Sequence, residues 1–146
     1  MKDTLRIREI IEKAIKDLDY PKSPSSLYAP IEYILSLPAK RIRPLLVLLS
    51  HQVFDDNLEE ALFPAIAIEV FHNFTLLHDD IMDNAPLRRG EQTVHEKWDD
   101  NVAILSGDVM MIHAYQLLSK TKTKNLIEVF NVFGKAAVKV CEGQQL

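Results

Sequence analysis

One segment, from Ala65 to Met82, constrains the fold of this 146-residue chain more than any other part of it. It reads AIAIEVFHNFTLLHDDIM, with apolar residues at helical spacing and neither glycine nor proline. This pattern predicts a long apolar helix. The aspartates Asp79, Asp80 and Asp83 stand at its carboxyl end. The fold must therefore accommodate a helix that is apolar along most of its length and acidic at one end.

Asp79 and Asp83 are four residues apart, so they lie on the same face of the predicted helix. His72 lies within about 20° of the same line, whereas Asp80 is rotated by about 100°. Acidic groups at the carboxyl end of a helix oppose its dipole and need a compensating cation. Mg²⁺ suits them, because it binds through one or two carboxylates together with substrate phosphates. We expect Asp79 and Asp83 to be metal ligands and Asp80 to support them; the alternative is a solvated acidic helix end.

Two basic clusters accompany the aspartates. Arg88 and Arg89 follow within a few residues, and Lys40, Arg41 and Arg43 crowd together before Pro44. The planar fork of arginine matches the oxygens of a phosphate group. Acidic and basic groups placed so close together indicate a metal-bridged diphosphate between them. For the cluster before Pro44, a solvated basic turn is the alternative.

The rest of the chain also reads as helical. Amphipathic spacing predicts a helix from 3 to 18, and a Pro- and Ser-rich loop covers 20–26. Asn57, with Glu60 three residues on, fits the amino-terminal cap of the central helix. Further helices are expected at 27–37, 44–54, 99 or 100 to 118, and 125–146. Strands are not expected, so the fold class is all-α.

Composition narrows the function. A formal charge of −4 argues against nucleic acid as a main partner. The charged amino terminus is not a signal peptide, and no apolar run approaches the roughly 20 residues that span a bilayer. Cys141 is the single cysteine, so no disulfide framework exists. We therefore expect a cytoplasmic protein without a transmembrane segment.

Through these aspartates and basic clusters, the chain resembles the trans-isoprenyl diphosphate synthases, the polyprenyl synthetase family. The stretch DDIMDNAPLRRG, residues 79–90, is similar to the family's first aspartate-rich motif with its paired arginines and glycine. Pro38 to Pro44 resembles the segment GGKRxRP, with Pro-Ala where two glycines are usual. Ala103 to Asp108 resembles a helix that carries a Gly-Asp pair, and Gly143-Gln144 resembles the start of GQxxD.

The second aspartate-rich motif of the family does not occur before Leu146. Residues 1–146 therefore resemble the N-terminal half of a polyprenyl synthetase domain, which is the N-terminal part of the isoprenoid synthase helical bundle. A truncation, a proteolytic fragment and a short gene product all remain open. We expect this stretch alone to be a poor catalyst.

The resemblance implies a Mg²⁺-dependent prenyl transferase that condenses an allylic diphosphate with isopentenyl diphosphate, head to tail, as a homodimer. It assigns Asp79 and Asp83 to the metal and Arg88 to the allylic diphosphate, with Gln144 near that substrate. Lys40, Arg43, His72 and Arg89 are assigned to isopentenyl diphosphate. Phe74 stands at the family's chain-length position, with Thr75 beside it. A farnesyl to geranylgeranyl product is expected, with geranylgeranyl favoured.

Two other functions stay open. One is a non-catalytic half-synthase subunit that binds a partner through unpaired helix faces. The adjacent pair His78-Asp79 also occurs in metal-dependent phosphohydrolases, although that function leaves the arginine clusters and Phe74 unexplained.

Overall fold

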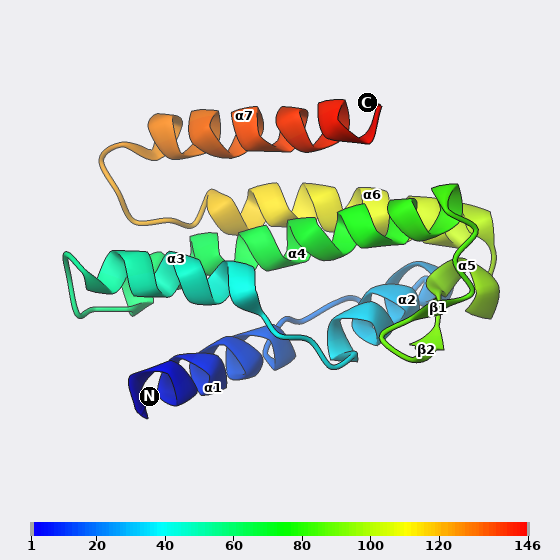
Figure 1. Cartoon of the computed structure of the whole chain (residues 1–146), viewed down its shortest axis with the longest axis horizontal. Helices are drawn as coiled ribbons and strands as arrows, with labels where there is room; N and C mark the ends of the chain where they lie inside the picture. The colour runs from blue at the N-terminus through cyan, green and yellow to red at the C-terminus, as the bar shows by residue number, and fades with distance from the viewer. Residues whose placement is uncertain (1, 146) are drawn as a thin grey trace.

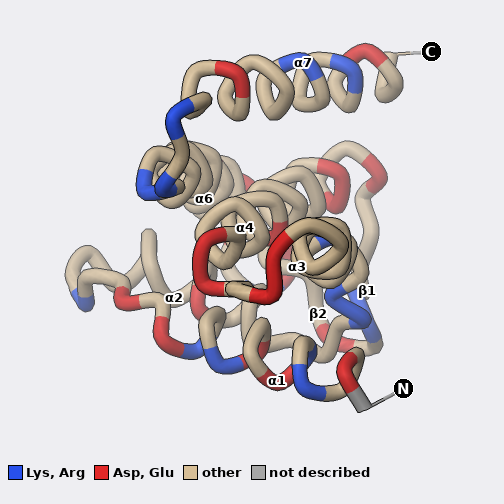
Figure 2. Tube along the Cα trace, turned by 90° about the vertical axis from the view of Figure 1, so that its left-hand side faces the viewer, with Lys and Arg blue, Asp and Glu red and all other residues tan. Residues whose placement is uncertain are grey.

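The long apolar segment forms the central helix of the computed structural model, which describes residues 2–145 (Figure 1). This helix, α4 (Glu59–Met82), packs mainly against α6 (Asp100–Leu118) and α3 (Ile42–Gln52). Helix α1 (Lys2–Lys16) and α2 (Ser25–Ser36) lie on one side of these three helices, and α7 (Leu126–Gln144) lies on the other. Figure 2 shows the same layering from the end of the bundle. The predicted all-α class is confirmed.

The core lies where α4 and α6 meet the helices beneath them. Small residues, among them Ala65, Ala103 and Ala114, let the backbones of α4 and α6 approach closely. Larger side chains, including Ile31 of α2 and Ile11 of α1, close the core from below. Each such side chain contributes about 1.5–3 kcal/mol on burial. This packing holds α4 in place, so the acidic end of α4 is fixed relative to α6.

Helix α7 is packed differently from the others. None of its residues is buried, and Phe130, Phe133 and Ala137 are half-buried against the core. Ile127, Val132 and Val138 of the same helix are exposed. One face of α7 therefore covers the core, and its other faces carry apolar side chains to the surface.

A short hairpin follows α4 and corrects the expectation that strands are absent. Strand β1 (Leu87–Arg88) pairs antiparallel with β2 (Glu91–Gln92), and α5 (Val94–Lys97) comes directly after it. The two turn residues, Arg89 and Gly90, have φ of +56° and +84°. Positive φ at both central residues is the geometry of a type I′ turn, which matches the twist of a hairpin.

The amino-terminal end of α4 also differs from the expectation. Asn57 does not cap this helix, because the capping position is Leu58, without a side-chain bond. The backbone N–H of Asn57 instead donates to Asp55 Oδ1 at 2.8 Å, within the preceding turn. At the start of α6, by contrast, one of the two expected starting residues, Asp99 or Asp100, caps the helix. Asp99 accepts a hydrogen bond from the Val102 amide at 2.8 Å.

Helix α4 is long and apolar enough, by length and composition, to cross a bilayer, with a mean hydropathy of 1.3 in its most apolar window. This corrects the expectation that no run approaches that length. In the structure 56% of that window is buried among the other helices. The apolar composition of α4 is therefore explained by its place in the core.

Candidate active site

The acidic end of α4 places two carboxylates one helical turn apart. Asp79 is half-buried, and Asp83 is the exposed residue that ends the helix, its amide donating to the Asp79 carbonyl at 2.8 Å. Burial raises the pKa of Asp79, and the nearby charge of Asp83 raises it further. A half-buried carboxylate beside a second negative charge forms a site that a cation would stabilise.

Asp80 faces away from this pair and is buried beside the hairpin. Its carboxylate accepts hydrogen bonds from Arg88 Nε at 2.9 Å to Oδ1 and 3.2 Å to Oδ2. This pairing raises the pKa of the Arg88 guanidinium. Asp79 and Asp83 raise the same pKa through their charges, so all three aspartates lie within electrostatic reach of Arg88. The Asp80 side chain thus holds Arg88 next to the acidic pair.

Two turns earlier on α4, His72 contacts a cation from α3. Arg43 Nη1 lies 3.1 Å from His72 Nε2. Burial, together with the Arg43 charge, lowers the pKa of His72 to about 4. The ring is therefore neutral at neutral pH. Because a guanidinium can only donate, Nε2 accepts this bond and Nδ1 carries the ring proton.

Arg89 lies on the turn of the hairpin and points a second guanidinium toward the same region. Burial and the nearby charge of Arg41 lower its pKa, and the charges of Arg88 and Arg89 both act on His72. The Arg89 Nη1 atom is buried and has no hydrogen-bond partner among the described residues. A buried donor without a partner costs about 1–3 kcal/mol. An anionic ligand would satisfy it.

Of the two remaining predicted site residues, Gln144 contacts the site, whereas no described contact brings the Lys40 side chain to it. Lys40 is exposed, just before α3. Gln144, at the end of α7, donates from Nε2 to Asp79 Oδ1 at 2.9 Å. The structure therefore brings the last turn of α7 to the acidic end of α4. The sequence order alone could not show this contact, which joins residues 65 positions apart.

Phe74 and Thr75 point to different parts of the structure. Phe74 packs between α4 and α6, with its ring against His78 and Phe71 at centroid distances of 4.8 and 5.3 Å. Thr75 instead lines a cavity of about 140 Å³ whose polar wall is Arg43 and His72. The rest of that wall is apolar, formed by residues of α4 and α7: Ile68, Phe71, Phe133, Ala136, Ala137 and Val140.

His78 has a packing role. Its Nε2 atom lies 3.2 Å from the Ile104 carbonyl and 3.9 Å from an Asp108 oxygen. A methyl group added at Gly107 would come within 2.6 Å of the same ring. The resemblance drew attention to the Gly-Asp pair, and the structure shows that Gly107 lets α6 approach α4 at this point.

Sequence reasoning missed two buried charges next to the site. Arg41 and Glu69 form an ion pair of 2.9 Å, with side-chain exposures of 3% and 2%. The interpretation of residues 40–43 as a solvated basic turn is thus wrong for Arg41. Glu69 carried a signal that was overlooked, because it is a lone acid within an apolar helical run.

The donor set of the acidic pair fits Mg²⁺. The described residues contain no cluster of three or more acidic, histidine or cysteine side chains that would form a complete metal cage. Two carboxylates are enough for Mg²⁺, which keeps several waters and takes other ligands from substrate phosphates. Asp79 and Asp83 are the residues that would hold it.

Comparisons with known proteins identify the family to which the chain is similar. The Polyprenyl synthetase family profile matches residues 24–146. A short chain isoprenyl diphosphate synthase of Methanocaldococcus jannaschii is 40% identical over 141 residues. That match covers 95% of this chain and 43% of the relative. A geranylgeranyl diphosphate synthase of Methanosarcina mazei is 38% identical over 138 residues, which is 93% of this chain and 43% of the relative.

Solved structures give the same result. A crystal structure of a geranylgeranyl pyrophosphate synthase superposes with a TM-score of 0.93 at 47% identity, over 97% of this chain and 43% of that one. The geranylgeranyl pyrophosphate synthetase of Pyrococcus horikoshii superposes with a TM-score of 0.90 at 36% identity, over 97% and 45%. The chain thus spans less than half the length of each of these four proteins.

Proposed function

Because this chain belongs to the polyprenyl synthetase family, we propose that its site binds the two substrates of a prenyl transferase. The reaction joins an allylic diphosphate to isopentenyl diphosphate, head to tail. One observation carries the proposal. The acidic pair Asp79 and Asp83 is separated by two helical turns, about 10 Å along α4, from His72. His72 lies beside two members of the basic set, which consists of Lys40, Arg43 and Arg89. This spacing provides separate places for two diphosphates, with their hydrocarbon ends between them.

The allylic substrate is assigned to the acidic end. Mg²⁺ held by Asp79 and Asp83 would neutralise the diphosphate as it leaves. Arg88 adds a fixed positive charge beside it, and the hydrogen bonds from Arg88 to Asp80 orient this guanidinium before the substrate arrives. Gln144 contacts Asp79 and closes the site from the α7 side.

Isopentenyl diphosphate is assigned to the basic set. Arg43, Arg89 and the exposed Lys40 supply positive charge, and the unpaired Arg89 Nη1 supports an anionic ligand at this place. The neutral His72 accepts from Arg43 and so keeps that guanidinium in position. After the allylic C–O bond breaks, the double bond of isopentenyl diphosphate attacks the allylic cation, and a proton is then lost to the released diphosphate.

Product length, assembly and location complete the proposal. We assign Phe74 and Thr75 to the end of the chain-growth pocket and expect a short product, with geranylgeranyl favoured over farnesyl. We propose a homodimer, for which the exposed Ile104, Leu105 and Ile112 on α6 provide an apolar face. A cytoplasmic location is proposed from the single free cysteine, Cys141.

The alternatives make different use of the same residues. A non-catalytic subunit would use the exposed apolar side chains of α7, and that function is supported by the absence of buried residues in this helix. A metal-dependent phosphohydrolase would need His78 beside Asp79 as a ligand. The contact of His78 with the Ile104 carbonyl argues against that role.

Incubation of the full-length polypeptide with labelled isopentenyl diphosphate, an allylic diphosphate and Mg²⁺ separates the three functions. A prenyl transferase converts the label into a longer prenyl diphosphate, which chromatography resolves. A phosphohydrolase releases phosphate without lengthening the chain. A non-catalytic subunit leaves both substrates unchanged, and either of the last two results would refute the proposal.

A further inference from the structure

A buried ion pair lies directly behind the basic set, and no step of the proposed reaction uses it. Arg41 Nη1 donates to Glu69 Oε1 at 2.9 Å, and Asn73 Nδ2 donates to the same oxygen at 3.2 Å. Burying two charges is costly unless each is paired and hydrogen-bonded. A pair this deeply buried, two residues from Arg43 in the chain, calls for a function in the arrangement of the site.

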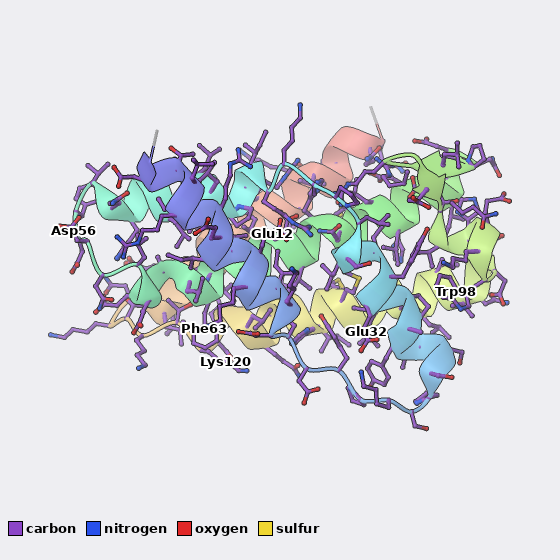
Figure 3. The ribbon with its side chains drawn as sticks, turned by 90° about the horizontal axis from the view of Figure 1, so that it is seen from below. Glu12, Glu32, Asp56, Phe63, Trp98 and Lys120 are labelled. Atoms are coloured by element: carbon purple, nitrogen blue, oxygen red, sulfur yellow. The ribbon has the colours of Figure 1, made fainter. Side chains whose placement is uncertain are left out.

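Arg41 connects four parts of the fold. Its Nη2 atom donates to the Leu35 carbonyl at 2.6 Å, at the end of α2, and its Nε atom donates to Glu12 of α1 at 3.1 Å. Figure 3 shows Glu12 on α1, seen from below the bundle. Arg41 itself is the residue before α3 and has a φ of +46°. Residues other than glycine rarely adopt this conformation, so the side-chain bonds hold the backbone in it.

We infer that Glu69 is a positioning residue for the isopentenyl diphosphate site and that it acts through Arg41. Glu69 stands one turn before His72 on α4, while Arg41 lies between Lys40 and Arg43. The ion pair therefore fixes the turn that presents Lys40 and Arg43 relative to His72. The inference rests on the proposed function. It adds that the Arg41–Glu69 ion pair sets the geometry of the isopentenyl diphosphate site and not of the allylic site.

Two observations show that Glu69 works from behind the site. Its side chain is 2% exposed and directs Oε1 to Arg41 and Asn73. A carboxylate facing a diphosphate would repel it. Here the negative charge of Glu69 is paired with Arg41 and neutralises the charge of that arginine. The Arg43 guanidinium is left exposed, with His72 as its described partner.

The test compares Glu69→Gln, Arg41→Lys and the double variant in the full-length polypeptide. Glutamine keeps the shape of Glu69 but loses its charge, and lysine keeps the charge of Arg41 but loses the fork. Each single variant should raise KM for isopentenyl diphosphate about tenfold or more, since a misplacement of about 1 Å can cost on the order of 10²-fold. KM for the allylic substrate and kcat should change far less. KM for isopentenyl diphosphate in the double variant should not exceed that of the more affected single variant, because each substitution removes the same Arg41–Glu69 ion pair.

Glu59→Gln is the matched control, because it makes the same change at an exposed position on the same helix. It should leave both KM values unchanged. Equal rises in the two KM values, a loss confined to kcat, or additive effects in the double variant would overturn the inference. If the wild-type protein makes no prenyl diphosphate, the proposed function fails instead, and the two failures are thereby distinguished.

A second variant decides the matter if Glu69→Gln does not fold. Glu12 bonds Arg41 from the partly exposed side, with a side-chain exposure of 42%, so Glu12→Gln should be tolerated. It should raise KM for isopentenyl diphosphate selectively, by less than Arg41→Lys does. An unchanged KM in Glu12→Gln, or a rise matched by the allylic substrate, would refute the positioning role.

Discussion

Arg88 and Arg89 are neighbours in the chain with opposite surroundings. Arg88 is paired with the buried Asp80, whereas Arg89 has a buried nitrogen that finds no partner among residues 2–145. The difference follows from the hairpin, because Arg88 ends a strand and Arg89 starts the turn with a positive φ. Two arginines that a motif presents as a pair therefore have different neighbours in the fold, which is consistent with the proposal that they serve different substrates.

Replacing Arg89 with lysine tests this division. Lysine keeps the charge but loses the planar fork that grips two phosphate oxygens. KM for isopentenyl diphosphate should rise about tenfold, while KM for the allylic substrate stays within about twofold, since each tenfold change corresponds to about 1.4 kcal/mol. Initial rates with each substrate varied in turn provide the measurement. Equal changes in the two KM values would show that the pockets are assigned wrongly.

Phe74 leads to a prediction about product length. Its ring packs against Phe71 and His78, so truncation opens space along α4. A packed aromatic does not yield space without strain, so Phe74→Ala should lengthen the product by at least one isoprene unit. Chromatography of the products from the full-length variant measures this, with Phe63→Ala at the far end of α4 as control. An unchanged product distribution would place the length gauge on another helix.

At the scale of elements, helical spacing predicted most of the fold. The expected helices exist, and the bounds of α6 agree with the prediction made from Asp99. The hairpin and α5 were missed, because two-residue strands and a helix of one turn are too short to show a period. The buried state of Arg41 was also unpredictable, because its partners come from three separate helices.

The contact between α4 and α6 depends on Gly107. A Cβ there would lie 2.6 Å from His78 Nε2, closer than atoms can pack without a shift. Gly107→Ala should therefore lower the free energy of unfolding by about 1–2 kcal/mol, even though alanine favours helices. Urea denaturation measures the change.

Gly134 of α7 provides the control for this substitution. It also lies within a helix, but an added Cβ meets nothing within 4 Å. Gly134→Ala should raise stability by up to about 1 kcal/mol, as alanine does in an open helical position. Equal effects at the two glycines would show that close packing at Gly107 does not matter.

At the scale of the whole molecule, the surface is more apolar than a self-sufficient bundle needs. Leu46 of α3 is 56% exposed, Phe54 just after α3 is 90% exposed, and Ile127 of α7 is 78% exposed. Figure 3 places Phe63 and Lys120 toward one end of the bundle and Trp98 toward the other. Apolar side chains on α3 and α7 are thus not covered by the residues that the structure describes.

The 146-residue polypeptide on its own should therefore self-associate. Exposed apolar patches beyond a few hundred Å² usually find a partner. Sedimentation velocity over a range of micromolar concentrations should show oligomers, and Ile127→Lys combined with Val132→Lys should reduce them. A sharp monomer at all concentrations would contradict the prediction.

The candidate site was predicted as a set of residues but not as a geometry. Periodicity along one helix related His72 to Asp79 and Asp83, because His72 and Asp79 lie on α4 and Asp83 is its C-cap. Contacts between elements, such as Arg43 with His72 or Gln144 with Asp79, depend on how α3 and α7 pack. The spacing of residues in the sequence does not predict contacts between helices. The family resemblance predicted a role for each residue but not these contacts.

The acidic end of α4 is proposed to support metal-dependent prenyl transfer, and the turnover of Asp83→Ala at limiting Mg²⁺ tests this function most directly. Loss of a metal ligand removes several kcal/mol of charge stabilisation, so kcat in the full-length protein should fall by at least about 10²-fold. Asp56→Ala, exposed before the opposite end of α4, should retain wild-type turnover. A wild-type rate and an unchanged Mg²⁺ requirement in Asp83→Ala would contradict the account.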